Sequence, residues 1–209
     1  GSEITQEADG LSSGLRRCSN ASYIAALMSR IGVTDIRTIV VPDDIRQLTR
    51  TLVELDAVCD VIITVGGTGK GKRDYTRQAV SDAGGVFVGH DTQLDSPFVT
   101  ARLPHAGLIG LPGNPLAVMM IVQCVLLESV RSVFHLPEAP AQTVEAVMTE
   151  DIEAGICGEL CVNVNESAAK PLIKGTGRMR VFDSARGFVR LNGQGIKRGE
   201  RVRVELFRN

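Results

Sequence analysis

The residues best suited to chemistry lie in the run VIITVGGTGKGKRDYT, between Val61 and Thr76. Its glycines permit positive φ angles and leave no Cβ between the backbone and a ligand. These glycines are Gly66, Gly67, Gly69 and Gly71, with Thr68 among them. The loop also carries three cations, Lys70, Lys72 and Arg73, followed by one acid, Asp74. Backbone N–H groups beside positive side chains favour an anion such as phosphate.

The elements around this loop follow from the same run of residues. The apolar and β-branched segment Val61–Val65 predicts a short strand covered on both faces. A helix is expected to begin near Asp74, so the unpaired N–H groups of its first turn would face the loop. The segment is therefore predicted to be a strand, an anion-binding loop and a helix.

Two other interpretations of the loop remain open on the residues alone. Gly66 to Lys72 satisfies the G-x-x-x-x-G-K pattern of nucleoside-triphosphate loops, but Arg73 stands where a hydroxyl must hold magnesium. A dinucleotide fingerprint fails because Lys72 occupies its third glycine position. The structural alternative is a strand-to-helix turn with an exposed basic tip.

The composition of the 209 residues excludes several classes of protein. A hydrophobic content of 44% is enough for a substantial core. The formal net charge of −1 indicates neither a nucleic-acid partner nor an anionic membrane surface. The five cysteines are odd in number and widely spread, and no signal peptide is visible, which together favour a reducing, cytoplasmic compartment.

Before the glycine loop the sequence alternates between helical and strand patterns. Asn20 is expected to cap a helix that ends at Gly32, and Ile36–Val41 is expected to form a buried strand. Pro42, Asp43 and Asp44 then turn into a second helix, whose apolar residues begin at Ile45. This rhythm predicts a parallel sheet with helices on both faces, and ligands of such sheets bind at the carboxyl ends of the strands. Asp43 and the glycine loop are thus expected on one rim. One of the two aspartates would cap the helix, and the other could hold a cation.

A second candidate motif reads GLIGLPGNPLAVMM. Leu108–Leu111 is expected to end a strand, the next residues turn, and Pro115 starts a helix without loss of a hydrogen bond. A second helix N-terminus is therefore predicted at the rim. The apolar run Leu116–Leu127, interrupted by Gln123, is too short to span a membrane and predicts a buried helix, packed across the sheet or at a subunit interface.

After a linker rich in proline the pattern changes to short alternating segments separated by turn residues. They run from Thr143 to Phe207 and predict a small all-β domain that closes as a barrel. We therefore expect two domains, an α/β domain at residues 1–138 and a β domain at residues 143–209.

Together these motifs resemble a known family. The GGTG loop followed by RDYT is similar to the loop of the molybdopterin-binding fold of MogA, MoeA and gephyrin, and the VPDD turn and LPGNP occur in the family order. The C-terminal β domain, with its Gly199-Glu200 turn before the last strand, resembles MoeA proteins and is absent from MogA. The chain thus resembles the C-terminal part of a MoeA-type molybdopterin molybdotransferase. Such a protein carries two further domains, so we expect a fragment or an unusually short relative.

The resemblance implies a three-layer, mostly parallel α/β sheet with helices on both faces, followed by the small barrel. It also implies binding of molybdopterin or adenylylated molybdopterin, and insertion of molybdate with magnesium-assisted release of AMP. Asp74 and Asp43 would be the catalytic and metal-binding residues. Other cofactor-assembly proteins or apo-molybdoenzymes would be partners, with no nucleic acid or membrane involved. The ligand-binding residues implied are Gly66, Gly67, Thr68, Gly69, Lys70, Lys72, Arg73, Pro112, Gly113, Asn114 and Pro115.

The loop departs from the MoeA pattern in two respects. Gly69 replaces the usual serine and Lys72 replaces the first acid, as in a loop closer to MogA. The lysine-rich KPGKP segment is also missing. A lysine in place of a carboxylate favours holding a phosphate and disfavours metal-assisted hydrolysis. A non-catalytic module that binds or carries molybdopterin, or a related pterin or nucleotide, is therefore the alternative.

Overall fold

The structure is a computed structural model that describes residues 4–5, 16–68, 75–88, 98–137, 140–172 and 184–208. The chain divides into two compact units, one with the described residues up to Val118 and the other with those from Met119 onward. This division falls inside a helix rather than at the 138–143 linker. The assignment of domains at residues 1–138 and 143–209 remains a prediction.

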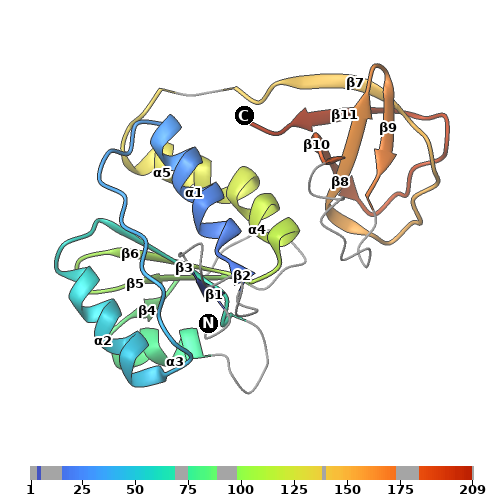
Figure 1. The fold of residues 1–209 in the computed structure, drawn as a ribbon. Coiled ribbons are helices and arrows are strands. Elements are labelled where there is room, and N and C mark those ends of the chain that lie inside the picture. Colours follow the sequence, from blue (N-terminus) through green and yellow to red (C-terminus); the bar gives the residue numbers. More distant parts are fainter. Residues whose placement is uncertain are drawn as a thin grey trace. The chain divides into compact units, whose positions relative to one another are not determined.

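The first unit contains a four-stranded sheet in the order β3-β6-β5-β4 (Figure 1). These strands are Val61–Val65 (β3), Val86–Phe87 (β4), Val99–Arg102 (β5) and Gly107–Leu111 (β6). β3 and β6 run parallel, whereas β5 pairs antiparallel with both β6 and β4. The mixed α/β class is confirmed, but the three-layer, mostly parallel sheet is not. A short hairpin joins β5 to β6, and such a connection allows only antiparallel pairing.

The strand predicted at Ile36–Val41 is wrong. These residues have irregular backbone, and the side chain of Ile39 is 54% exposed. A strand is stable only when a neighbour takes up its backbone hydrogen bonds. Among the described residues, β3 pairs with β6, and residues 36–41 are not part of any sheet.

Two helices contribute to the hydrophobic core of this sheet, and a third, α1, precedes them in the sequence. The core contains residues of α2 (Ile45–Asp56), α3 (Tyr75–Asp82) and the sheet. It consists of Leu52, Ile62, Ala79, Val80, Ala101, Leu103, Ala106 and Leu108. Helix α1 (Ser19–Arg30) begins one residue before Asn20, with Cys18 in the cap position. The prediction that Asn20 caps this helix is therefore wrong. A two-residue parallel pair, β1 (Ile4–Thr5) with β2 (Arg16–Arg17), precedes it.

A long helix follows the sheet and crosses from the first unit into the second. It comprises α4 (Pro115–Ile121), a π-helical turn η2 (Val122–Leu126) and α5 (Leu127–Val133). By length and composition alone this helix could cross a membrane, a test that buried core helices also pass. Its residues from Val118 to Val122 are buried, as are Leu126 and Leu127. The prediction of a buried helix is confirmed.

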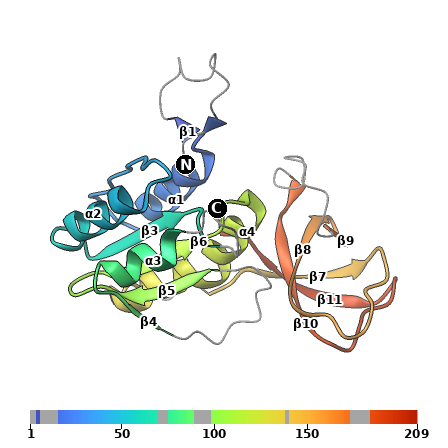
Figure 2. The ribbon, with the colours of Figure 1, turned by 90° about the horizontal axis from the view of Figure 1, so that it is seen from below.

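The second unit contains a closed five-stranded barrel in the order β10-β11-β7-β9-β8 (Figure 2). Its strands are Thr143–Met148 (β7), Cys157–Asn165 (β8), Ala168–Pro171 (β9), Gly187–Asn192 (β10) and Arg201–Leu206 (β11). Alternate residues of the strands fill the interior, among them Met148, Val162, Val189 and Val204. The predicted barrel is confirmed. The alternating pattern between Thr143 and Phe207 also predicts a strand at Met179–Phe182, which lies outside the described residues.

All five cysteines are free, and we expect those of the second unit to differ sharply in reactivity. Burial raises the pKa of both Cys124 and Cys161 to about 12, whereas Cys157 is exposed. Because the thiolate is the nucleophile, iodoacetamide at pH 8 should label Cys157 well before the other two. Peptide mass spectrometry measures the three rates. Labelling of Cys124 as fast as that of Cys157 would contradict the assignment.

Candidate functional site

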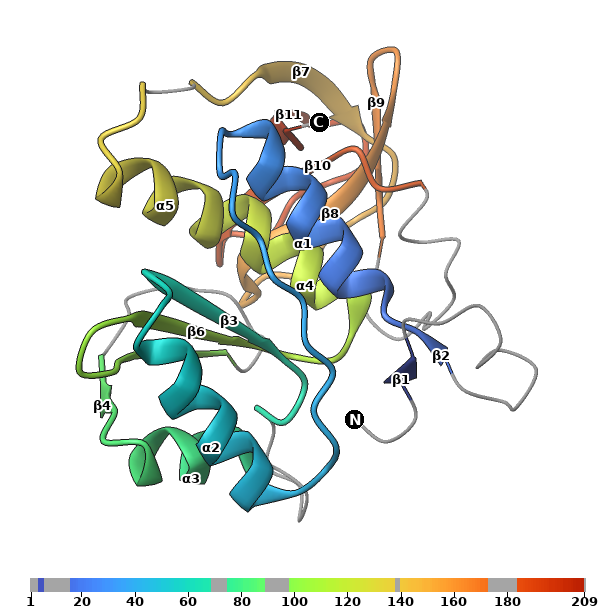
Figure 3. The same cartoon turned by 60° about the vertical axis from the view of Figure 1, so that its left-hand side comes forward.

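The glycine loop follows β3 and the LPGNP turn follows β6. These two strands are paired and lie side by side in Figure 3. The parallel register pairs Val65 with Leu111. The Gly66 N–H donates to the Leu111 carbonyl oxygen at 2.8 Å. A Cβ added to Gly113 would lie 3.9 Å from the Gly66 Cα, so the two turns lie next to each other. The glycine loop and the LPGNP turn therefore begin at the same edge of the sheet. This is the carboxyl end of a parallel strand pair, where α/β proteins bind ligands.

Thr76, in the first turn of α3, holds the start of the glycine loop. Its Oγ1 donates to the Gly66 carbonyl oxygen at 3.2 Å, and its N–H donates to the Gly67 carbonyl oxygen at 3.3 Å. Gly66 and Gly67 have φ angles of +91° and +68°, which side chains rarely adopt. Thr76 is only 2% exposed. Its role was missed because a threonine in a first helical turn carries no distinctive sequence signal.

Threonine side chains pack beneath the loop against Gly110 of β6. A Cβ at Gly110 would lie 3.1 Å from Thr68 Cγ2, 3.2 Å from Thr64 Oγ1 and 3.3 Å from Thr76 Cγ2. Thr68 is 2% exposed, so its side chain is part of the support of the loop. Contact of Thr68 with a ligand remains a prediction.

The LPGNP turn caps its own helix. Asn114 Oδ1 accepts hydrogen bonds from the N–H groups of Leu116, at 2.9 Å, and Ala117, at 3.2 Å. Pro115 has no N–H, so the first-turn donors of α4 are satisfied within the chain. This corrects the expectation that this helix start offers its N–H groups to an anion. Contacts of Pro112, Gly113, Asn114 and Pro115 with a ligand remain predictions.

Asn20 fixes the same turn from α1. Its Nδ2 donates to the Gly113 carbonyl oxygen at 3.0 Å, across a sequence separation of 93 residues. No local pattern around Asn20 indicates such a distant partner. The residue expected to cap a helix is instead the link between α1 and the LPGNP turn.

The structure separates the roles of the two neighbouring aspartates. Asp44 caps α2, with its Oδ1 accepting the Gln47 N–H at 2.8 Å. Asp43 lies in the preceding bend and is exposed. Asp43 is therefore the better candidate for a cation ligand. The argument that placed it on the rim fails, however, because residues 36–41 do not form a strand.

The remaining predicted site residues lie outside the described part of the chain. They are Gly69, Lys70, Lys72, Arg73 and Asp74, whose roles remain predictions. Among the described residues, no three His, Cys, Asp or Glu side chains are grouped so as to hold a metal ion. A cation site formed by Asp74 and Asp43 remains a prediction.

Comparison with known proteins identifies the class to which this fold and loop belong. The family model described as "Probable molybdopterin binding domain" matches residues 1–132. The chain belongs to this family.

The molybdopterin-binding domain of this chain is of the MoeA type, and molybdopterin molybdenumtransferases are among the proteins similar to it. The molybdopterin molybdenumtransferase of Haemophilus influenzae is 26% identical over 121 residues, which cover 57% of this chain and 30% of that protein. Molybdopterin molybdenumtransferase 2 of Mycobacterium tuberculosis is 26% identical over 159 residues, which cover 73% of this chain and 39% of that protein. The chain thus spans well under half the length of these relatives.

A solved structure confirms the fold of nearly the whole chain. The molybdopterin biosynthesis MoeA protein of Pyrococcus horikoshii superposes with a TM-score of 0.84 at 22% identity. The match covers 99% of this chain and 52% of that protein, so it includes the barrel.

We expect Gly67→Ala to destabilise the first unit more than a matched change at Gly32. Both glycines have positive φ, for which an added Cβ costs about 1–2 kcal/mol. At Gly67 the Cβ would also lie 2.7 Å from Thr76 Oγ1, whereas at Gly32 it meets nothing within 4 Å. Urea denaturation measures both free energies of unfolding.

A double variant isolates the cause. Gly67→Ala combined with Thr76→Ala removes the clashing oxygen and should cost less than the sum of the two single changes. Strict additivity would show that Thr76 does not clamp the loop.

Proposed function

We propose that the chain binds molybdopterin during molybdenum cofactor biosynthesis and inserts molybdate into the adenylylated form. The observation that carries this proposal is the anchoring of Gly66 between Leu111 and Thr76. This anchoring fixes a glycine loop beside the LPGNP turn at the end of a parallel strand pair. Membership of the molybdopterin-binding family and the names of the relatives support the ligand.

Each part of the loop has a separate task in this proposal. The backbone of Gly66 and Gly67 lets a phosphate approach closely, because no side chain intervenes. Lys70 and Lys72 neutralise the phosphate charge. Carboxylate oxygens suit Mg²⁺, and Asp43 is exposed and is not the helix cap, so Asp43 and Asp74 would hold the ion. A bound Mg²⁺ would stabilise the charge on the leaving phosphate.

A non-catalytic molybdopterin carrier is the second candidate. Lys72 stands where related proteins of the MoeA type have an acid, and it adds a fixed cation. The Asn114 cap also removes two N–H donors from the rim. Both features support retention of a phosphate more than its release.

Calorimetric titration with molybdopterin and adenylylated molybdopterin, each with and without Mg²⁺, separates the two candidates. For the enzyme we expect tighter binding of the adenylylated form in Mg²⁺, and release of AMP once molybdate is added. Asp74→Ala should abolish that release. Binding of plain molybdopterin that is independent of Mg²⁺ and unchanged in Asp74→Ala would favour the carrier. Binding of neither compound would contradict both.

The neighbouring aspartates provide a matched pair of variants. Asp44→Ala removes the α2 cap and should cost about 1 kcal/mol of stability with little effect on ligand affinity. Asp43→Asn should weaken the Mg²⁺-dependent part of binding. Denaturation and calorimetry on the same two variants test both statements. Mg²⁺-dependent binding that is unaffected by Asp43→Asn would remove Asp43 from the site.

A further inference from the structure

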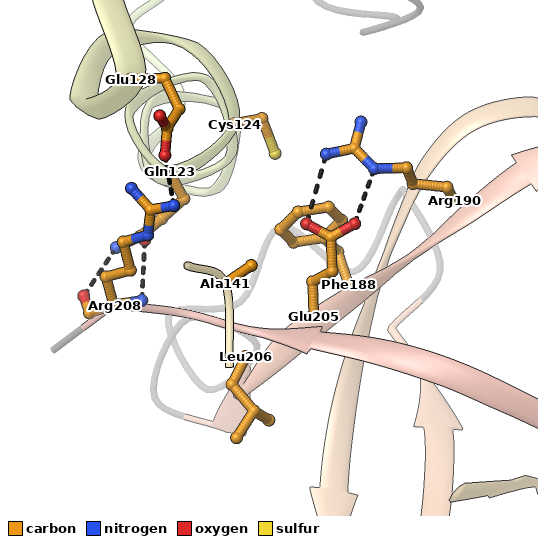
Figure 4. Close-up of a pocket in the computed structure, with 9 residues that line it drawn as sticks. All are labelled: Gln123, Cys124, Glu128, Ala141, Phe188, Arg190, Glu205, Leu206 and Arg208. Atoms are coloured by element: carbon orange, nitrogen blue, oxygen red, sulfur yellow. Dashed lines mark hydrogen bonds and ion pairs between the residues drawn. The ribbon is translucent and has the colours of Figure 1, made fainter. Parts of the chain in front are cut away.

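A cavity of about 220 Å³ lies in the second unit, between the long helix and the barrel (Figure 4). The π-helical turn contributes Gln123 and Cys124 to its lining, and the Cys124 thiol points into the space between the Arg190 and Arg208 side chains. Such a turn is rare and often marks a functional position. None of the residues that line this cavity belongs to the candidate site of the first unit.

The charged side chains of the lining balance one another and are paired. Arg190 donates to both carboxylate oxygens of Glu205, from Nε at 2.8 Å and from Nη2 at 3.3 Å. The Arg208 guanidinium pairs with Glu128. Two arginines thus stand against two glutamates. A charged ligand would have to displace one member of a pair or stay unpaired in a partly enclosed space, and both are unfavourable.

The charges around the cavity disfavour a further negative charge inside it. Glu159 of β8 does not line the cavity, but its Oε1 is 3.3 Å from Nη1 of Arg190, to which it adds a second carboxylate. The Cys124 thiol registers the result. Burial is the main cause that raises its pKa to about 12, and Glu159 raises this pKa by more than Arg190 lowers it. The thiol is therefore neutral at physiological pH, and an anion beside it would meet the same unfavourable field.

Arg208 provides a hydrogen-bond donor that has no acceptor. Of the side-chain nitrogen and oxygen atoms that the described residues contribute to the lining, only Nη1 of Arg208 is buried without a hydrogen-bond partner. The Gln123 amide holds the backbone of this arginine, because it donates to the Arg208 carbonyl oxygen at 3.0 Å and accepts the Arg208 N–H at 2.9 Å. A buried donor without an acceptor is costly. The cavity therefore suits a ligand that brings an acceptor, and the spare donor disfavours a cation.

The rest of the lining favours an aromatic ring. Phe188 and Leu206 supply apolar surface, and the Arg190 guanidinium carbon lies 5.3 Å from the Phe188 ring centroid. A guanidinium whose N–H groups are paired with carboxylates still offers its face to an aromatic ring. An apolar cavity of about 150 Å³ holds benzene. A cavity of about 220 Å³ therefore has room for one ring with a small substituent.

We propose that this cavity binds a small neutral aromatic molecule with a carbonyl group. The carbonyl oxygen accepts a hydrogen bond from Arg208, and the ring packs against Phe188 and Leu206. A hydrocarbon would leave the Arg208 donor unpaired, an anion would add to the charge of the glutamates, and a cation would face a donor.

NMR titration of the full chain with benzamide, benzoate and benzamidinium tests the proposal, because these three probes have nearly the same shape and differ in charge. We expect benzamide to give saturable shifts at Cys124, Phe188 and Arg190. Both ions should bind about tenfold more weakly or worse, because neither finds an unpaired partner of opposite charge.

Variants of the lining test the assigned roles. Arg208→Met keeps the length of the side chain and removes its donors, and should weaken benzamide binding about tenfold. Arg203→Met makes the same change at an exposed position of β11 and should leave the affinity unchanged. Glu128→Gln removes one lining carboxylate and should strengthen benzoate binding relative to that of benzamide.

A further variant guards against a loss of binding caused by misfolding. Ala141 lines the cavity at an exposed position in irregular backbone, so Ala141→Leu should fill the space and abolish the shifts while the barrel signals stay in place. Benzoate or benzamidinium that binds as tightly as benzamide would overturn the proposal, as would full affinity in Arg208→Met. A benzamide titration without saturable shifts would also overturn it and would mean that the cavity holds water only.

Discussion

The parallel pairing of β3 with β6 is the constraint on which the rest of the first unit depends. It brings the ends of two strands, far apart in the sequence, to one edge of the sheet. The Gly66 N–H bond to Leu111 continues this ladder by one residue into the loop. If the register slipped by a single residue, the glycine loop would lose this bond and the threonines would lose their place against Gly110.

Three interactions then fix the described residues of the candidate site around this pairing. Thr76 binds the loop to α3, Asn114 closes the first turn of α4, and Asn20 connects the LPGNP turn to α1. In each of the three, a side-chain oxygen or amide forms a hydrogen bond with a backbone group. Gly66 and Gly67 at the start of the loop, and the LPGNP turn, are thus held by hydrogen bonds from three different helices.

The elements near the distinctive motifs could be predicted from the sequence. The prediction fails where the structure of a segment depends on residues far away in the sequence. Local glycine placement predicts the turn at Gly66 and the start of α3. Alternation of apolar and polar residues predicts the barrel strands. Ile36–Val41 has strand-forming residues, but whether it is a strand depends on a neighbouring strand that local pattern does not reveal. The turn at Pro104 does indicate, from local residues, that the segments on its two sides pair as strands, and β5 and β6 confirm it. The expectation of a mostly parallel sheet did not take this antiparallel pair into account. The roles of Asn20 and Thr76 depend on contacts across the chain, and no spacing rule indicates them.

The barrel and the sheet differ in what they leave exposed. The five barrel strands close into a ring, so their backbone donors and acceptors are largely satisfied by one another. Another protein can recognise the barrel only through its side chains and turns. The sheet of the first unit instead ends in β4, where Val86 and Phe87 are exposed beside an edge that pairs with no further strand in the described residues. Of the two units, the one that carries the glycine loop is therefore the one in which backbone pairing with another chain must be prevented.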